Sequence, residues 1–218
     1  MKKLAKVLCL CLTLCMVLPL VLSCGKSQND YLGVMLSTNV MSLDTNLATD
    51  GESFEVIADC IDGLMQMDAT GAATYAIAES YDLSDDGKTY TFHLRDAKWS
   101  NGDPVTADDF VFAWRRIALL RGEYAYMLDE IGQIKGAADI ISGKTDDTTG
   151  LAVTAKDSKT LVVELEVPVS FFPSLMYFPT FFPINEKFYT SLKEGTYGTS
   201  PATFLSNGAF ILENYVPG

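Results

Sequence analysis

The chain has 218 residues, of which 28 are acidic and 16 are basic, so its formal net charge is −12 at pH 7. This acidic balance lacks the basic footprint that nucleic-acid binding requires, and we expect no nucleic-acid partner. Apolar residues make up 48% of the sequence, which excludes a largely disordered chain and gives enough material for one or two domains.

The first 23 residues resemble a bacterial export signal. Three lysines precede an apolar run, residues 7–22, which is short for a membrane span. The run ends in Val21-Leu22-Ser23-Cys24, which resembles the lipobox of bacterial lipoproteins. We therefore expect residues 1–23 to be removed and Cys24 to carry a lipid anchor, with residues 24–30 as a polar tether. The protein would be exported and anchored to the cell membrane, on its periplasmic side or outer surface. The alternative is a plain signal peptide with an incidental cysteine.

Cysteine usage agrees with this processing. Cys9, Cys11 and Cys15 lie in the segment that is removed, and Cys24 is the lipid site, so only Cys60 remains. An intramolecular disulfide is then impossible. Apolar residues share the helical face of Cys60, and we expect its thiol to be buried and inert, the alternative being a reactive thiol.

The mature chain opens with a predicted buried strand at residues 31–37 and a polar loop at residues 38–50. Ser53 is predicted to cap a helix that runs to about Met65. The apolar positions of this helix recur at helical spacing and predict its buried face: they are Phe54, Ile57, Ile61 and Leu64.

A strand, a turn and a helix follow within residues 88–116. Tyr90, Phe92 and Leu94 alternate with polar residues, which is typical of a half-buried strand. Gly and Pro then predict a turn at residues 101–104. Beyond it, Thr106 is predicted to open a helix with Asp109 in a capping box, and Phe110, Trp114 and Ile117 form its apolar face.

The rest of the chain alternates helices and strands. We predict a helix at residues 124–141, strands at residues 151–155 and 160–166, and a short aromatic helix after Pro168. Asn185 is predicted to cap a helix over residues 186–192. The aromatic residues between 171 and 182 are read as a plug between lobes, although Tyr177 or Phe178 could instead line a ligand pocket.

The sequence offers little catalytic chemistry. His93 is the only histidine, which removes histidine-based nucleophile systems and histidine-rich metal sites. The adjacent aspartate pairs already serve as predicted turns or helix caps, and neighbouring carboxylates do not face each other across a cleft. We expect no enzyme activity, no catalytic residue, no metal site and no cofactor.

Several segments together resemble one protein family. The stretch TFHLRDAKWSNGDPVTADDFVFAWRR resembles the signature of the oligopeptide/dipeptide-binding class of extracellular solute-binding proteins of ABC importers. SLDTNLATD, the following DGL, the AES at residues 78–80 and SNGAFILENYVPG resemble further segments of that family. Thr45, Asp62 and Ala209 depart from its usual Pro, Glu and Pro.

The resemblance implies an α/β fold of mixed α+β type, a periplasmic-binding-protein-like two-lobed clamp with a small satellite domain. Residues 31–61 would begin lobe I, residues 62–184 would form the satellite domain, and residues 185–218 would return into lobe I. Members of the family run on for longer, so we expect an N-terminal fragment in which the second lobe is absent.

The function that the resemblance implies is delivery of peptides, oligopeptides above all, to an ABC transporter's permease subunits by a lipid-anchored monomeric receptor. Peptide would pair as an added strand through its main chain. Matching the family's spacing places ligand contacts on Thr49, Asp50 and Gly51, with Tyr124 from the satellite domain. The groups that bind the peptide termini would lie in the second lobe. Two alternatives remain: a surface interaction or adhesion lipoprotein on the same fold, and a binder of another solute such as a metal chelate, haem or sugar.

Overall fold

The computed structural model describes residues 33–215. The chain divides into two compact units, Met1–Met35 and Leu36–Gly218, and the second contains every helix and strand described below. The predicted signal peptide, the tether and Cys24 lie outside the described residues. Within residues 33–215, no helix combines the length and the apolar character needed to cross a membrane.

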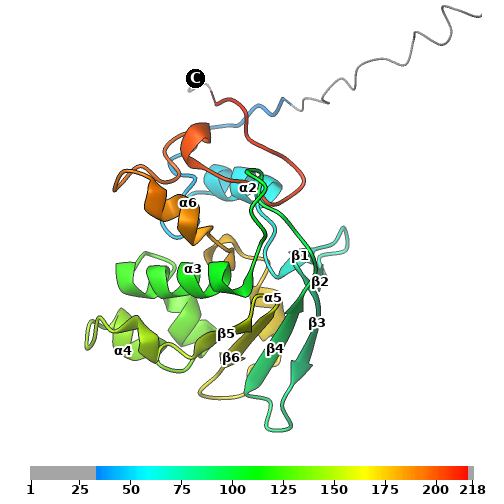
Figure 1. Cartoon of the computed structure of the whole chain (residues 1–218), viewed down its shortest axis with the longest axis vertical. Coiled ribbons are helices and arrows are strands. Elements are labelled where there is room, and N and C mark those ends of the chain that lie inside the picture. Colours follow the sequence, from blue (N-terminus) through cyan, green and yellow to red (C-terminus); the bar gives the residue numbers. More distant parts are fainter. Residues whose placement is uncertain (1–32, 216–218) are drawn as a thin grey trace, which may run out of the picture. The chain divides into compact units, whose positions relative to one another are not determined.

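A four-stranded antiparallel sheet forms the lower part of the second unit (Figure 1). Its strand order is β3-β4-β6-β5. The strands are β3 (Ala78–Leu83), β4 (Thr89–Leu94), β5 (Val153–Asp157) and β6 (Thr160–Glu164). In β4 the side chains of Tyr90, Phe92 and Leu94 are buried, which confirms the predicted alternation. A separate hairpin pairs β1 (Met65–Met67) with β2 (Ala73–Tyr75).

Helix α3 (Ala107–Leu120) packs beside β5 and β6 (Figure 1). The Asp109 carboxylate accepts a hydrogen bond from the N–H of Thr106 at 2.9 Å, so the predicted pairing at the helix start is confirmed. Phe110, Trp114 and Ile117 are fully buried on its inner face. The predicted strand, turn and helix are therefore all present.

Helix α2 (Gly51–Cys60) begins and ends earlier than predicted. Its cap is Asp50, whose carboxylate accepts a hydrogen bond from the N–H of Ser53, and the prediction of Ser53 as the cap was wrong. The Ser53 hydroxyl instead accepts hydrogen bonds from the N–H groups of Met41 and Ser42. The chain turns extended at residue 61, because Gly63 must pass against the Met176 carbonyl, where a Cβ would lie only 2.4 Å away.

The predicted first strand, at residues 31–37, is wrong. Residues 33–37, which the structure describes, form no strand, and Val34 and Met35 are exposed. Residues 209–215 also form no strand. The two residues just before this segment bond to the end of α2 instead. The N–H groups of Asn207 and Gly208 both donate to the Cys60 carbonyl. Neither segment has a ladder partner within the described part of the chain, and an extended segment without one is not a strand.

The predicted helix at residues 124–141 is broken in two. A π-helical turn, η1 (Met127–Ile131), precedes the short helix α4 (Ala137–Ile141). Gly136, at φ +82°, lies between them. Its missing side chain lets the backbone pass the Gly150 carbonyl, which a Cβ would approach to 2.1 Å. The apolar spacing suggested one continuous helix, but the glycine conformation interrupts it.

The remaining elements are short. They are α5 (Phe172–Leu175), α6 (Glu186–Ser191) and the 3₁₀ turns η2 (Thr148–Gly150), η3 (Pro179–Phe181) and η4 (Pro201–Thr203). The Asn185 side chain accepts a hydrogen bond from the N–H of Phe188 at 2.8 Å, which confirms it as the cap of α6.

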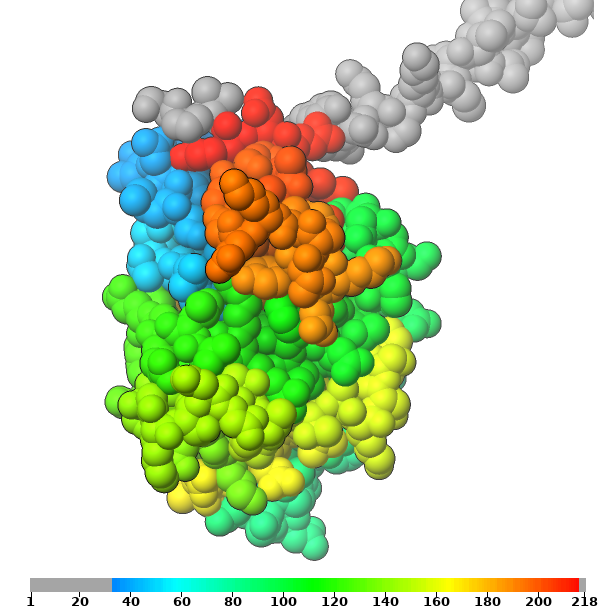
Figure 2. Space-filling view, turned by 60° about the vertical axis from the view of Figure 1, so that its left-hand side comes forward, coloured from blue at the N-terminus to red at the C-terminus, as the bar shows by residue number. Residues whose placement is uncertain are grey.

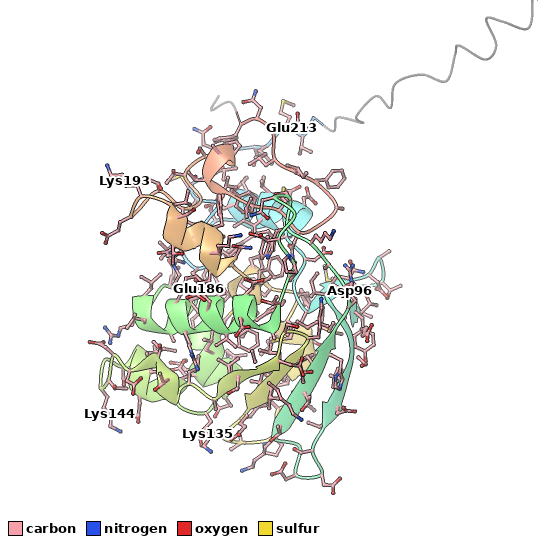
Figure 3. All side chains as sticks on the ribbon, viewed as in Figure 1. Asp96, Lys135, Lys144, Glu186, Lys193 and Glu213 are labelled. Carbon is pink, nitrogen blue, oxygen red and sulfur yellow. The ribbon has the colours of Figure 1, made fainter. Side chains whose placement is uncertain are left out.

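Two hydrophobic clusters stabilise the second unit. The larger lies between the sheet and α3. The smaller lies around α2, and its buried members are Leu43, Ala48, Ile57, Cys60, Ile61, Phe182 and Phe204. The predicted burial of Cys60 is therefore confirmed. Charged side chains such as Lys135, Lys144 and Lys193 point outward (Figure 3). The division into lobe I and satellite domain stays a prediction.

Candidate functional site

The loop that enters α2 presents unpaired main-chain groups. Thr49 and Gly51 are exposed and Asp50 is half-buried. Both oxygens of the Asp50 carboxylate are occupied by Ser53, one by its N–H at 2.8 Å and the other by its hydroxyl at 2.6 Å. Among residues 33–215, no hydrogen bond engages the main chain of Thr49 or the N–H groups of Asp50 and Gly51. The groups left for a ligand are therefore main-chain donors and the Thr49 carbonyl.

Tyr124 joins this loop through an aromatic cluster. The Tyr124 ring meets Phe54 of α2 at a centroid distance of 5.3 Å and Phe178 at 5.4 Å, and Phe54 and Phe178 lie 5.1 Å apart. All three rings are only partly buried. Because Phe54 lies one helical turn beyond Asp50, the structure brings Tyr124 to the same end of α2 as Thr49, Asp50 and Gly51.

The aromatic segment between residues 171 and 182 divides between the two predicted roles. Phe172, Phe181 and Phe182 are buried in the hydrophobic clusters and act as packing residues. Phe178 instead lies beside Tyr124, at the candidate site. Phe172, Phe181 and Phe182 are thus core residues, whereas a plug between lobes and a ligand-pocket role for Phe178 stay predictions.

Residues beneath the loop were missed by sequence reasoning. Arg116 of α3 donates to both carboxylate oxygens of Asp44 and to the side-chain oxygen of Asn46. Asp44 lies in SLDTNLATD and Arg116 ends the signature stretch, so the two segments that carry the family resemblance meet here. The sequence signal for these residues was that both lie in segments resembling the family. Their spacing in the sequence, however, does not indicate that Arg116 and Asp44 contact each other.

A groove of about 470 Å³ lies elsewhere, on the outer side of α3. Its lining includes Val111, Phe112, Arg115 and Tyr189, and none of the four predicted ligand residues. Thr49 and Gly51 are exposed, so the candidate site is an open wall of this unit. A wall of this kind can bind an extended ligand only with a second surface facing it.

The sole histidine takes no part in this site. The imidazole Nε2 of His93 lies 2.8 Å from a carboxylate oxygen of Asp82, and both side chains are exposed on the sheet. Within residues 33–215, no group of three or more His, Cys, Asp or Glu side chains could hold a metal ion. The chemistry available at the candidate site is hydrogen bonding and aromatic contact.

Comparison with protein families gives one match over most of the chain. The family of bacterial extracellular solute-binding proteins, family 5 (middle part), matches residues 72–218. This range includes the signature stretch and Tyr124, and the family is one of solute-binding proteins. The chain is also similar to two named proteins and to one protein of solved structure.

A dipeptide-binding protein of Lactococcus lactis is 37% identical over 89% of this chain and 36% of its own length. A probable deoxycholate-binding periplasmic protein of Escherichia coli is 36% identical over 80% of this chain and 32% of its own length. The structure of Listeria monocytogenes OppA bound to peptide superposes with a TM-score of 0.78 at 39% identity, covering 83% of this chain and 35% of that one. The chain thus spans about a third of the length of these proteins.

Proposed function

Because the chain belongs to the bacterial extracellular solute-binding proteins of family 5, we propose that it takes part in peptide uptake as the receptor of an ABC importer, with oligopeptides as the main ligands. Residues 31–61 and 185–218 contribute to the first lobe and residues 62–184 form the satellite domain. A second lobe supplies the wall that faces the candidate site. Rotation about a hinge closes the second lobe over the ligand. Ligand binding and transfer to the permease subunits make up the whole activity, without an enzymatic step.

The observation that carries this proposal is the set of unpaired main-chain groups, the N–H groups of Thr49, Asp50 and Gly51 and the Thr49 carbonyl, at the same end of α2 as the ring of Tyr124. A peptide in an extended conformation offers C=O and N–H groups that these donors and acceptors can pair with. Such groups are common to all peptides, so the wall binds peptides of many sequences. The aromatic cluster packs against peptide side chains or main-chain planes without selecting one residue type.

The protein works at the cell surface. Cys24 carries the lipid anchor, residues 24–30 act as the tether, and the receptor meets the permease as a monomer. Replacing the lipidated cysteine in Cys24→Ser would release the protein into the soluble extracellular fraction, since a single modified residue provides the anchor. Retention of that variant in the membrane fraction would exclude this anchor.

Thermal denaturation of the full-length protein tests the ligand class. A peptide at 100 times its Kd stabilises the native state by about 2.7 kcal/mol, which raises Tm measurably. We expect a rise with tetrapeptides of unrelated sequence. An absence of any shift across such a set would exclude a peptide receptor.

Deoxycholate provides the second arm of this test. One relative carries that ligand in its name, and binding of a non-peptide solute is the second candidate. A rise in Tm with deoxycholate and none with peptides would favour it. A surface interaction protein would instead show no shift with either ligand and would capture a protein partner.

A further inference from the structure

Arg116 is bonded to the turn that precedes the candidate site. Its Nη1 and Nη2 donate to the two carboxylate oxygens of Asp44 at 2.8 and 2.6 Å, and Nη1 also donates to Oδ1 of Asn46 at 2.8 Å. Only 11% of the Arg116 side chain and 4% of the Asp44 side chain are exposed. A planar guanidinium matches a carboxylate in this way at one relative orientation, so the contact fixes direction as well as distance.

Two tyrosine rings close around this guanidinium. Its central carbon lies 4.7 Å from the ring centroid of Tyr189 and 5.7 Å from that of Tyr197. Burial opposes the charge of Arg116, but Asp44 and Tyr189 more than offset it, so the pKa of Arg116 is raised. Burial, with Asp44 nearby, raises the pKa of the Tyr197 phenol. The guanidinium therefore stays charged and the phenol stays neutral at physiological pH.

The turn that Arg116 holds is closed on Asp44. The Asp44 carbonyl accepts hydrogen bonds from the N–H groups of Leu47 and Ala48 at 3.0 and 2.8 Å, and its carboxylate accepts one from the N–H of Asn46 at 3.0 Å. Residues 49–51 follow directly. These hydrogen bonds connect Asp44 to the residues just before 49–51. Fixing the orientation of Asp44 therefore also fixes the position of the main-chain groups of the candidate site.

Two glycines allow other backbone segments to close on the same turn. The N–H of Leu43 donates to the Gly198 carbonyl at 2.9 Å. A Cβ at Gly122 would lie 2.8 Å from the Asn46 carbonyl oxygen. Figure 2 shows the orange segment near residues 185–200 against the blue segment near residues 36–50, above the green surface of α3. Asp44, Thr45, Asn46 and Ala48 of the turn are buried, whereas Leu47, Thr49 and Gly51 are exposed.

The contacts between Arg116 and the Asp44 turn add little to the stability of the fold. Thr45 Oγ1, Asn46 Nδ2 and Arg116 Nε are buried and have no hydrogen-bond partner in the described part of the chain. Burying a pair of charges removes both from water, and this desolvation cost often cancels most of their attraction. In some proteins such pairs instead fix a single arrangement of the chain. Placement of the turn is the effect that the contacts support best.

We infer that Arg116 is a positioning residue for ligand binding, which holds the Asp44 turn so that residues 49–51 are already ordered before the ligand arrives. Arg116 does not touch the ligand itself. Ordering the loop in advance removes an entropic cost from binding, which raises affinity. The effect on affinity rests on the proposed function, whereas the ordering of the loop does not.

Hydrogen exchange of the unliganded full-length protein tests the ordering. Arg116→Lys keeps the charge but loses the two-pronged contact with Asp44. The matched control is Arg115→Lys, the same substitution one residue earlier; both arginines line the outer groove, but the bonds to Asp44 and Asn46 come from Arg116. We expect the hydrogen-bonded amides of Asn46, Leu47 and Ala48 to exchange about tenfold faster in Arg116→Lys, with the amides of β4 unchanged, and no such effect in Arg115→Lys. Equal exchange of these three amides in both variants would overturn the inference.

A second variant and a second measurement complete the test. If Arg116→Lys does not fold, Asp44→Asn is measured in the same way, and failure of both to fold would overturn the inference, because the pair would then hold the fold and not the loop. Calorimetry with tetra-alanine should show an affinity about tenfold lower for Arg116→Lys and unchanged for Arg115→Lys. If the unmodified protein binds no tetra-alanine, the proposed function fails while the exchange result still decides the role of Arg116.

Discussion

Phe54 and Tyr124 meet edge to face, with ring centroids 5.3 Å apart and ring planes at 80°. Phe54 lies on α2 just beyond the exposed loop, and Tyr124 comes from the segment that follows α3. Their contact, with Phe178 against both rings, brings the predicted ligand residues to one face of the unit. The aromatic cluster and the unpaired main-chain groups therefore lie at the same end of α2.

Replacing Tyr124 should weaken peptide binding more than it weakens the fold. Tyr124→Ala removes three ring contacts within the protein, to Phe54, Tyr126 and Phe178. It also removes the ring that packs against the peptide, a contact worth about 0.5–1.5 kcal/mol, and we expect peptide affinity to fall about tenfold. Tyr124→Phe should bind nearly as the unmodified protein does if the ring is what matters. The matched control is Tyr75→Ala, which removes an exposed, ring-paired tyrosine from β2. Calorimetry that shows equal losses for Tyr124→Ala and Tyr75→Ala would contradict a ligand role for Tyr124.

Gly198 should tolerate a side chain far less than Gly195 does. Both adopt left-handed backbone, at φ +69° and +75°, so each substitution by alanine carries a strain of about 1–2 kcal/mol. A Cβ at Gly198 would also lie 2.3 Å from the Asp44 nitrogen, whereas one at Gly195 would meet nothing within 4 Å. We expect Gly198→Ala to lower the free energy of unfolding by about 1–3 kcal/mol more than Gly195→Ala does. Urea denaturation gives both values, and equal losses would show that the Asp44 turn moves freely.

The Cys60 thiol should be protected in the native state. Burial raises the pKa of this thiol, which opposes formation of the reactive thiolate. In a chain that starts at Gly25, Cys60 is the only cysteine. We expect a thiol reagent to modify it at least about a hundredfold more slowly in buffer than in denaturant. Similar rates in the two conditions would mean that the cluster around α2 opens readily.

Asp62 should make stability depend on pH. Burial raises the pKa of its carboxyl above the ordinary value of 3.8, and Arg95 offsets this only in part. The folded state therefore holds the proton more tightly, so this contribution to stability is present below pH 3.8 and is lost as pH rises through the raised pKa.

The variant Asp62→Asn stays neutral and isolates this effect. Its free energy of unfolding should increase relative to the unmodified protein as pH rises through that window, and the difference should level off above it. Chemical denaturation in a series of buffers from about pH 3 to 7 measures both proteins. A difference that is constant over the whole series would be inconsistent with the raised pKa of Asp62.

Sequence reasoning succeeded where local patterns and packing agree. Alternating apolar residues in β4, the Thr106–Asp109 pairing and the inner face of α3 all follow from short-range rules that tertiary contacts reinforce. It failed where a distant segment decides the outcome. The cap of α2 moved to Asp50 because the Ser53 hydroxyl bonds to Met41 and Ser42, a contact that no local pattern contains.

The candidate site was predictable only in part. Family spacing selected Thr49, Asp50, Gly51 and Tyr124, and the structure places them at one end of α2. Phe54 was assigned to the core, because its spacing fits the buried face of the helix, yet its ring lies beside Tyr124. Arg116 was missed, because its partner Asp44 lies far away in the sequence.

Gly51 gives the most direct test of main-chain binding. It is the first residue of α2, where proline is well tolerated, and a Cβ there meets nothing within 4 Å. The preceding residue, Asp50, is already extended at φ −115° and ψ 156°, as a residue before proline prefers. Gly51→Pro therefore removes one exposed N–H while keeping the fold, and Gly51→Ala keeps that N–H.

The decisive measurement is calorimetry of a tetrapeptide with the full-length protein and these two variants. A ligand carbonyl left without its donor costs about 1–3 kcal/mol, so Gly51→Pro should bind roughly tenfold or more weakly, with unchanged or higher Tm. Gly51→Ala should bind as the unmodified protein does. Equal affinities for Gly51→Pro and Gly51→Ala would contradict main-chain recognition at residues 49–51.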